Sequence, residues 1–282
     1  MDKVQEEKLR KQIRPDFDPV FFDRANKFVE FIHLPQLLFD GIKIGGIENL
    51  INVKDKQLFY VSNHVSMADF LVLPYVLWKN KLPIPSIIAG KNLFKFLFKT
   101  IWKKSGAIAL DRKGGREYLE IFQEETKKAL LNGISIVDFA EAGRNYSGIG
   151  LNKFKTGIFG MVSDIVEEGK DIYGVSVSLH YDKRPEQWAL PYIQWCKKKR
   201  DENLKTGNKL RAEIYDYSYF AFDVAAYFVR PFVKEKGNGY LKFEETFSIK
   251  DFIKNIDNKK KFFLASKFQT QINHLMSSQS DS

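Results

Sequence analysis

A histidine and an aspartate lie five residues apart in the stretch YVSNHVSMADF, which covers residues 60–70. His64 follows a run of strand-forming residues, and Asp69 falls in the first turns of the helix that we expect next. A carboxylate next to one imidazole nitrogen fixes the tautomer of the ring and stabilises its protonated form. His64 is therefore a candidate general base oriented by Asp69, although Asp69 also suits a helix N-terminus with no catalytic role.

Two further polar clusters follow predicted strands. Asp111 and Arg112 come directly after one strand, and residues 141–144, with a glutamate, a glycine and an arginine, come directly after another. Open α/β sheets bind their ligands outside the carboxyl ends of their strands. We therefore expect both clusters to meet His64 at one edge of a sheet, although a Glu-x-Gly-Arg sequence taken alone is also typical of an ordinary salt-bridged turn.

Strand and helix patterns alternate along the chain and define the elements that must position these residues. The predicted strands cover residues 57–62, 85–89, 107–110, 134–139, 172–179 and 239–247. The predicted helices cover residues 20–40, 67–78, 91–103, 116–131, 157–168 and 257–276, and glycines within 41–46 end the first of them. This alternation indicates an α/β fold with a mostly parallel, mixed sheet flanked by helices on both faces.

The chain has 282 residues and 44% apolar side chains, enough to bury a sizeable core. We expect an N-terminal helical segment at residues 1–46, an α/β domain at 47–276 and a disordered tail at 277–282. Within the domain, residues 185–238 are aromatic-rich and of mixed pattern, and we expect them to form a partly helical insertion. The single cysteine, Cys196, excludes a disulfide framework, and no apolar run predicts a secretory signal or a membrane-spanning helix.

A formal net charge of +10 favours an anionic partner, which can be nucleic acid, an anionic bilayer or a phosphorylated substrate. No recognisable nucleic-acid module accompanies the charge, so we expect no nucleic-acid partner. On a helix, residues 91–103 would carry a basic stripe beside an aromatic one, formed by Lys91, Lys95, Lys99 and Lys103 and by Phe94, Phe98 and Trp102. Such stripes are typical of helices in a membrane interface, and also of core helices whose lysines face water. The run Lys197-Lys198-Lys199-Arg200 is typical of a solvated loop.

Four blocks occur in the order and with the residues of one enzyme family. They are SNHVSMAD at 62–69, GAIALDR at 106–112, DFAEAGRNYSG at 138–148 and GVSVSLHYDKRPE at 174–186. Together they resemble the signatures of the glycerolipid acyltransferases, which acylate glycerol 3-phosphate and lysophosphatidate and carry a histidine-x4-aspartate motif. The resemblance covers about residues 57–186 and implies a glycerol-3-phosphate acyltransferase-like α/β fold.

The resemblance also implies a reaction. A fatty acyl chain would pass from acyl-CoA or acyl carrier protein to a hydroxyl of a phosphorylated glycerol or lysophospholipid, with His64 as general base and Asp69 as its orienting partner. Arginine can bind two phosphate oxygens at once, and glycine permits close approach of the backbone. The resemblance therefore implies that the substrate is bound by Arg112, Glu141, Gly143 and Arg144. The resemblance implies no cofactor, and the spacing of the histidines and carboxylates supports no metal site. It also implies a cytoplasmic protein, peripheral on the inner face of an anionic membrane.

Three departures concern the third block, where Ala140, Ala142 and Asn145 replace the usual proline, glycine and serine. The first two blocks look like lysophosphatidate acyltransferases, whereas the last two look like the branch that acts on glycerol 3-phosphate or dihydroxyacetone phosphate. We favour the second branch because its blocks match over a longer span. The alternatives are a lysophosphatidate acyltransferase, a non-catalytic lipid-binding homologue and a thioester hydrolase.

Overall fold

The computed structural model describes residues 3–94, 96–111, 114–141, 143–147, 150–256 and 258–278, without the side chains of residue 92 and residues 96–98. Three predicted site residues fall outside this description: Lys95 and Arg112 altogether, and Phe98 in its side chain.

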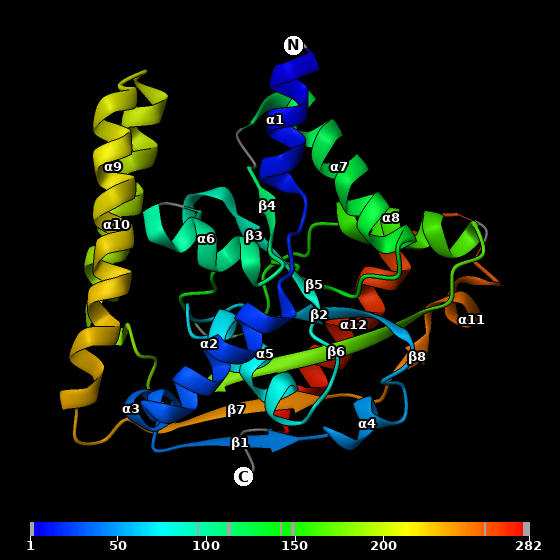
Figure 1. The fold of residues 1–282 in the computed structure, drawn as a ribbon, viewed down its shortest axis with the longest axis horizontal. Coiled ribbons are helices and arrows are strands. Elements are labelled where there is room, and N and C mark those ends of the chain that lie inside the picture. The colour runs from blue at the N-terminus through cyan, green and yellow to red at the C-terminus, as the bar shows by residue number, and fades with distance from the viewer. Residues whose placement is uncertain are drawn as a thin grey trace.

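The sheet is mixed and mostly parallel, as predicted (Figure 1). Its strands are β1 Gly41–Gly45, β2 Gln57–Ser62, β3 Ser86–Gly90, β4 Ile108–Leu110, β5 Ile136–Phe139, β6 Ile172–Tyr181, β7 Asn238–Phe243 and β8 Phe247–Ser248. They lie in the order β1-β7-β6-β2-β5-β3-β4, and β8 pairs with β6. β7 and β8 run antiparallel to β6, and the pairings among β2 to β6 and of β1 with β7 are parallel. The carboxyl ends of the central strands therefore share one edge.

Helices cover both faces of the sheet. One face carries α1 Lys3–Ile13, α7 Gly115–Leu131, α8 Gly157–Glu167, α11 Ile249–Ile253 and α12 Lys260–Ser277. The other carries α3 Leu34–Leu38, α4 Glu48–Ile51 and α5 Asp69–Lys79. In the central strand β2, Phe59 and Val61 pack into the first layer, and Leu58 and Tyr60 pack into the second. Because both faces are buried, β2 is apolar along most of its length rather than alternating with polar residues.

The segment at 41–46 differs from the prediction, since it was expected to end a helix and instead forms β1. Residues of β1 pair in parallel with β7 at the edge of the sheet, and Ile42 packs against the core. This pairing satisfies backbone groups that would otherwise lack partners. The sheet therefore starts within the predicted N-terminal helical segment, whose helices are α1, α2 Pro19–Phe31 and α3.

The insertion at 185–238 is a helical hairpin that stands beside the sheet (Figure 1). It consists of α9 Leu190–Lys205 and α10 Lys209–Val229, with short 3-10 turns at Gln187–Ala189 and Arg230–Phe232. Gly207, between the helices, has a φ of +75°, which favours glycine. The Asn208 side chain caps α10 by accepting a hydrogen bond from the backbone N–H of Arg211.

The basic segment is not the single helix expected at 91–103. A 3-10 turn at Lys91–Leu93 precedes α6, Phe96–Lys104, so Lys91 does not continue the face of α6. Phe94 and Trp102 pack inward against a small apolar cluster, and the Trp102 ring lies 5.2 Å from the Phe70 ring. Lys91 and Lys99 are exposed. The predicted aromatic stripe is thus partly engaged in packing, and within the described residues no helix is long and apolar enough to cross a membrane.

Candidate active site

His64 and Asp69 form a buried hydrogen-bonded pair between the end of β2 and the start of α5. The Nδ1 atom of His64 lies 2.7 Å from Asp69 Oδ2. The same oxygen accepts the backbone N–H groups of Val65 at 2.8 Å and Ser66 at 3.0 Å. Asp69 Oδ1 accepts the hydroxyl of Tyr181 at 2.8 Å. Asp69 is therefore fully buried with both oxygens hydrogen-bonded, which fixes its orientation toward the imidazole.

This geometry sets the tautomer of His64. Because Asp69 accepts at Nδ1, the neutral ring carries its proton there and keeps the lone pair of Nε2 for a substrate. Burial, together with the Asp69 carboxylate, raises the pKa of Tyr181 well above its usual range, so this phenol stays a donor to Asp69. The arrangement suits a general base whose protonated form is stabilised by a carboxylate.

The residues around the histidine build the turn that presents it. The Asn63 side chain both donates to the carbonyl of Leu179 and accepts from its N–H, each at 2.8 Å, which ties the turn to β6. Ser66 Oγ donates to Glu186 at 2.8 Å, and Glu186 also accepts the N–H of Met67 at 3.1 Å. These contacts explain why asparagine and serine flank His64 in the first block.

Glu141 forms hydrogen bonds with the segment that carries His64, and it does not position Arg144 as predicted. Its carboxylate accepts the N–H of His64 at 3.2 Å, the N–H of Asn152 at 2.8 Å and the side-chain amide of Asn145 at 3.2 Å. The N–H of Asn145 donates to the His64 carbonyl at 2.6 Å. The backbone at residue 145 therefore joins the third block to the first, while the asparagine side chain bonds Glu141 within the third block.

Arg144 lies at the predicted place but is engaged differently from the prediction. Its Nη1 donates to Asp223 at 2.7 Å and to Glu186 at 3.2 Å, and its Nη2 donates to Asp223 and to the hydroxyl of Tyr219 at 2.7 Å. The side chain is 2% exposed. Both terminal nitrogens are thus committed to protein partners, so the predicted two-oxygen grip on a phosphate is not open to Arg144 in this structure.

A polar cavity of about 270 Å³ opens beside the histidine. Its wall includes His64, Phe139, Gly143 and Arg144, together with Lys197 and Arg200 of α9. An added Cβ at Gly143 would meet no atom of the described residues within 4 Å, so among these residues this glycine leaves room in the cavity. The run at 197–200, predicted to be a solvated loop, is helical, and its residues three apart reach the site.

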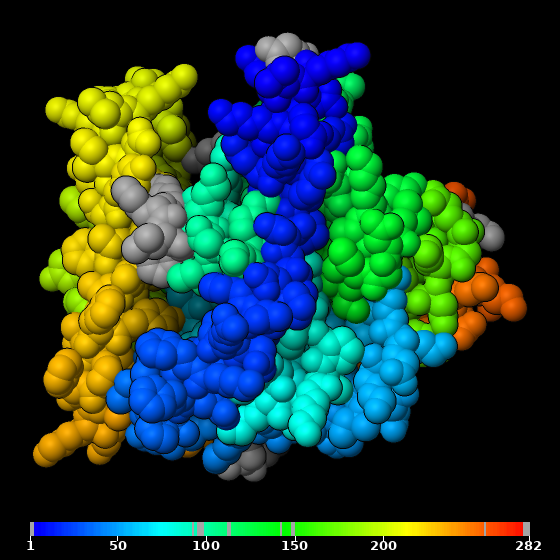
Figure 2. Space-filling model, in the orientation of Figure 1, coloured from blue at the N-terminus to red at the C-terminus, as the bar shows by residue number. Residues whose placement is uncertain are grey.

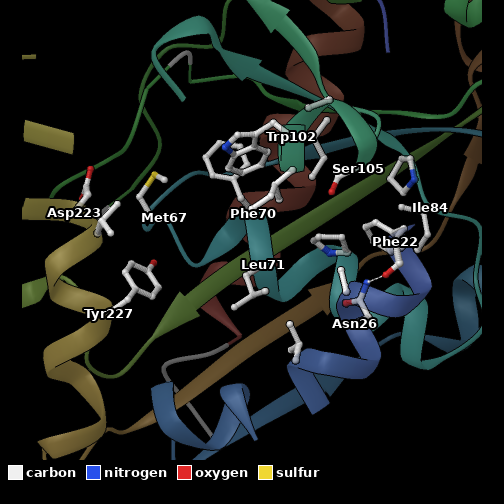
Figure 3. A pocket seen from close by; sticks show the side chains of 18 of the residues that line it. Phe22, Asn26, Met67, Phe70, Leu71, Ile84, Trp102, Ser105, Asp223 and Tyr227 are labelled. Atoms are coloured by element: carbon white, nitrogen blue, oxygen red, sulfur yellow. Dashed lines mark hydrogen bonds between the residues drawn. The ribbon is translucent and has the colours of Figure 1, made fainter. Parts of the chain in front are cut away.

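An apolar cavity of about 420 Å³, drawn in Figure 3, lies next to the polar one. Met67 and Phe70 line both, and the Phe70 ring lies 5.0 Å from the His64 ring. The remaining wall comes mainly from α2, α5, α6 and α10, and Figure 3 shows Phe22 and Tyr227 on opposite sides of it. Within the described residues, no group of three histidine, cysteine, aspartate or glutamate side chains is placed to hold a metal ion.

Several site residues were not predicted individually. Tyr181 and Glu186 lie inside the fourth block, so the block itself was a signal for them. Tyr219 and Asp223 belong to the insertion, where no motif marks them, and the hydrogen bond of Asp223 to Arg144 spans 79 residues of sequence.

Comparisons with known proteins indicate the class of protein. A family model described as Acyltransferase matches residues 41–179. Proteins named glycerol-3-phosphate acyltransferase are 25% identical over 225 residues in Alteromonas mediterranea, 29% over 213 residues in Shewanella amazonensis and 31% over 151 residues in Pseudomonas aeruginosa. These matches cover 77%, 72% and 52% of this chain but only 25%, 26% and 18% of the relatives, so the chain spans about a quarter or less of their length. Through residues 41–179, this chain is therefore similar to the acyltransferases, and its relatives support a place in the glycerolipid acyltransferase family.

Proposed function

We propose that this protein transfers a fatty acyl chain from a thioester to a hydroxyl of glycerol 3-phosphate or a related phosphorylated glycerol in phospholipid synthesis. The observation that carries the proposal is the position of His64, oriented by a buried carboxylate, where a polar cavity and an apolar cavity adjoin. The polar cavity suits the acceptor and the apolar cavity suits the acyl chain. The names of the relatives support glycerol 3-phosphate as the acceptor.

The chemistry follows from the tautomer. His64 Nε2 takes the proton of the acceptor hydroxyl while the hydroxyl oxygen forms a bond to the carbonyl carbon of the thioester. The tetrahedral intermediate then expels the sulfur, and the imidazolium returns the proton to give a free thiol and an ester. Asp69 stabilises the imidazolium between the two steps. The thioester is already activated, so positioning supplies much of the rate and the scheme contains no covalent acyl-enzyme.

The donor in this proposal is acyl-CoA or acyl carrier protein, and the enzyme acts at an anionic membrane surface. The net charge of +10 supports attraction to such a surface. Lysophosphatidate remains the alternative acceptor because it presents the same phosphate and a free hydroxyl.

Thiol release by purified protein tests the proposal. The panel combines acyl-CoA and acyl carrier protein donors with glycerol 3-phosphate, dihydroxyacetone phosphate, lysophosphatidate or no acceptor. We expect release that requires one phosphorylated acceptor and disappears in His64→Ala. Release without any acceptor would indicate a thioester hydrolase, and no release from any donor, with lipid binding intact, would indicate the non-catalytic homologue.

A further inference from the structure

A cation with no ion-pair partner among the described residues faces the polar cavity. Lys197 of α9 lines this cavity, and its ammonium lies 4.6 Å from the ring centre of Tyr146 and 5.3 Å from that of Tyr219. No carboxylate of the described chain lies within ion-pair distance of this ammonium. Aromatic faces stabilise an ammonium but do not neutralise it. The position of Lys197 therefore suits a ligand that brings negative charge.

The charges around Lys197 strengthen this point. Arg144 and Arg200 repel its positive charge, and Asp201 and Asp223 partly offset them. Burial, with the two guanidinium groups, lowers the pKa of Lys197 to about 8. A bound anion would stabilise the protonated form of Lys197 and raise its pKa again.

The two guanidinium groups of the cavity are already paired. Arg144 is bound by Asp223 and Glu186. Arg200 donates to Asp201 at 3.0 Å and to Asp216 at 3.2 Å. Lys197 differs from both, because no carboxylate of the described residues forms an ion pair with it.

We propose that Lys197, supplied by the helical insertion, binds the phosphate of the acceptor and thereby selects phosphorylated acceptors. This inference rests on the proposed acyl transfer and assigns to α9 the role expected of Arg144 in the third block. The open space beside Gly143 leaves room for the ligand. An ammonium is a compact point charge that binds phosphate without the fixed two-oxygen geometry of arginine.

The test compares three variants on one helix. Lys197→Gln removes the charge, Lys197→Arg keeps it, and Lys198→Gln is the matched control because Lys198 is exposed on the same helix. Loss of a charge-assisted hydrogen bond should raise the KM for glycerol 3-phosphate about 10- to 100-fold in Lys197→Gln. The kcat at saturating acceptor and the KM for the acyl donor should change little. Lys197→Arg should recover most of the affinity, and Lys198→Gln should match the wild type.

Two other arms separate charge from shape. Glycerol lacks the phosphate, so Lys197→Gln should leave the low kcat/KM for glycerol unchanged. The preference for glycerol 3-phosphate over glycerol should therefore largely disappear in this variant. Lysophosphatidate carries the same phosphate on a lipid. A similar rise in the KM for lysophosphatidate in Lys197→Gln would show that Lys197 binds that acceptor too. With wild-type protein, the KM for glycerol 3-phosphate should also rise above about pH 8, because Lys197 then loses its proton. Lys197→Arg should not show this rise, since arginine stays charged.

Calorimetric titration with glycerol 3-phosphate and with inorganic phosphate gives a readout independent of catalysis. If the wild type transfers acyl chains but Lys197→Gln keeps the wild-type KM and binding, the inference is overturned while the proposed function stands. If the wild type transfers no acyl chain yet binds glycerol 3-phosphate, and Lys197→Gln weakens that binding, the anion site stands while the acyltransferase falls. Wild-type protein that neither transfers nor binds would overturn both.

Discussion

The hydrogen bonds of Asp69 predict what its substitution will do. Asp69→Asn removes the charge that stabilises the protonated His64. The side-chain NH2 of the asparagine could also lie where Asp69 Oδ2 now accepts backbone N–H groups, and two donors would then face each other. We expect kcat to fall about 10²- to 10⁴-fold, with little change in either KM. Steady-state kinetics check this, and a thermal melt shows whether the variant is folded.

Tyr181→Phe is the matched control for this prediction, because it removes one hydrogen bond to Asp69 Oδ1 and leaves the bond to His64. Its kcat should fall much less than that of Asp69→Asn. A kcat of Asp69→Asn within twofold of the wild type would contradict the pairing of the two residues in catalysis.

Local sequence could identify His64 and Asp69 but not the partners of Arg144. The pair is separated by five residues across one turn, so its geometry follows from a strand that ends and a helix that begins. The arginine meets Asp223 across 79 residues, in an insertion whose packing no local pattern encodes. The same long-range packing brings Lys197 to the cavity, which is why a run of cations looked like a solvated loop.

At the level of elements, Arg144 ties the helical hairpin to the sheet. It joins the loop after β5 to α10 through Asp223 and Tyr219. Removing one partner of a buried ion pair leaves an uncompensated charge, so Arg144→Gln should lower the free energy of unfolding by about 3–5 kcal/mol. Urea denaturation measures this.

Arg116→Gln is the control for the hairpin prediction, since Arg116 pairs with Glu120 on the exposed face of α7 and should change stability little. The double variant Arg144→Met with Asp223→Leu should recover part of the loss, because it leaves no unpaired buried charge between these two positions. Equal stabilities of Arg144→Gln and Arg116→Gln would show that the hairpin does not depend on this ion pair.

The walls of the apolar cavity predict the chain-length preference. Val224 of α10 lines this cavity, so Val224→Phe should shorten the space and shift kcat/KM toward shorter acyl donors. Ala225→Phe places the same ring on the exposed side of the same helix and should leave the preference unchanged. Kinetics with a series of acyl-CoA lengths check both. An unchanged profile in Val224→Phe would place the acyl chain elsewhere.

Sequence patterns predicted those elements whose side chains are buried in regular order. The apolar run of β2 and the periodic faces of α7 and α8 lie where expected, because burial on a sheet imposes those patterns. β1 was missed because an edge strand of five residues with two glycines carries little apolar signal. The basic segment was predicted as one helix because its spacing of four is helical, whereas the structure has a 3-10 turn before α6.

At the scale of the whole molecule, the proposed membrane contact depends on charge and on exposed apolar side chains. Phe94 and Trp102 pack inward, so other aromatic residues are the candidates for membrane contact. Two phenylalanines of α2, Phe28 and Phe31, are 60% and 79% exposed, and Phe228 and Phe232 at the end of the hairpin are 74% and 87% exposed. Figure 2 shows the α2–α3 region beside the end of α10 on one face, and α3 contacts the turn that follows α10.

This apolar surface adjoins the cavity proposed for the acyl chain, because Val29 of α2 and Phe228 line that cavity. In the proposed reaction, this arrangement would place the acyl chain of a membrane lipid next to the cavity. Phe31→Ser with Phe232→Ser should reduce flotation with anionic vesicles, since each replacement removes an apolar side chain from the contact. Phe262→Ser with Phe263→Ser is the matched control on α12, where both residues are about half exposed. Added salt should weaken binding of all forms because the charge of +10 contributes, and equal flotation of the two double variants would show that this face does not contact the membrane.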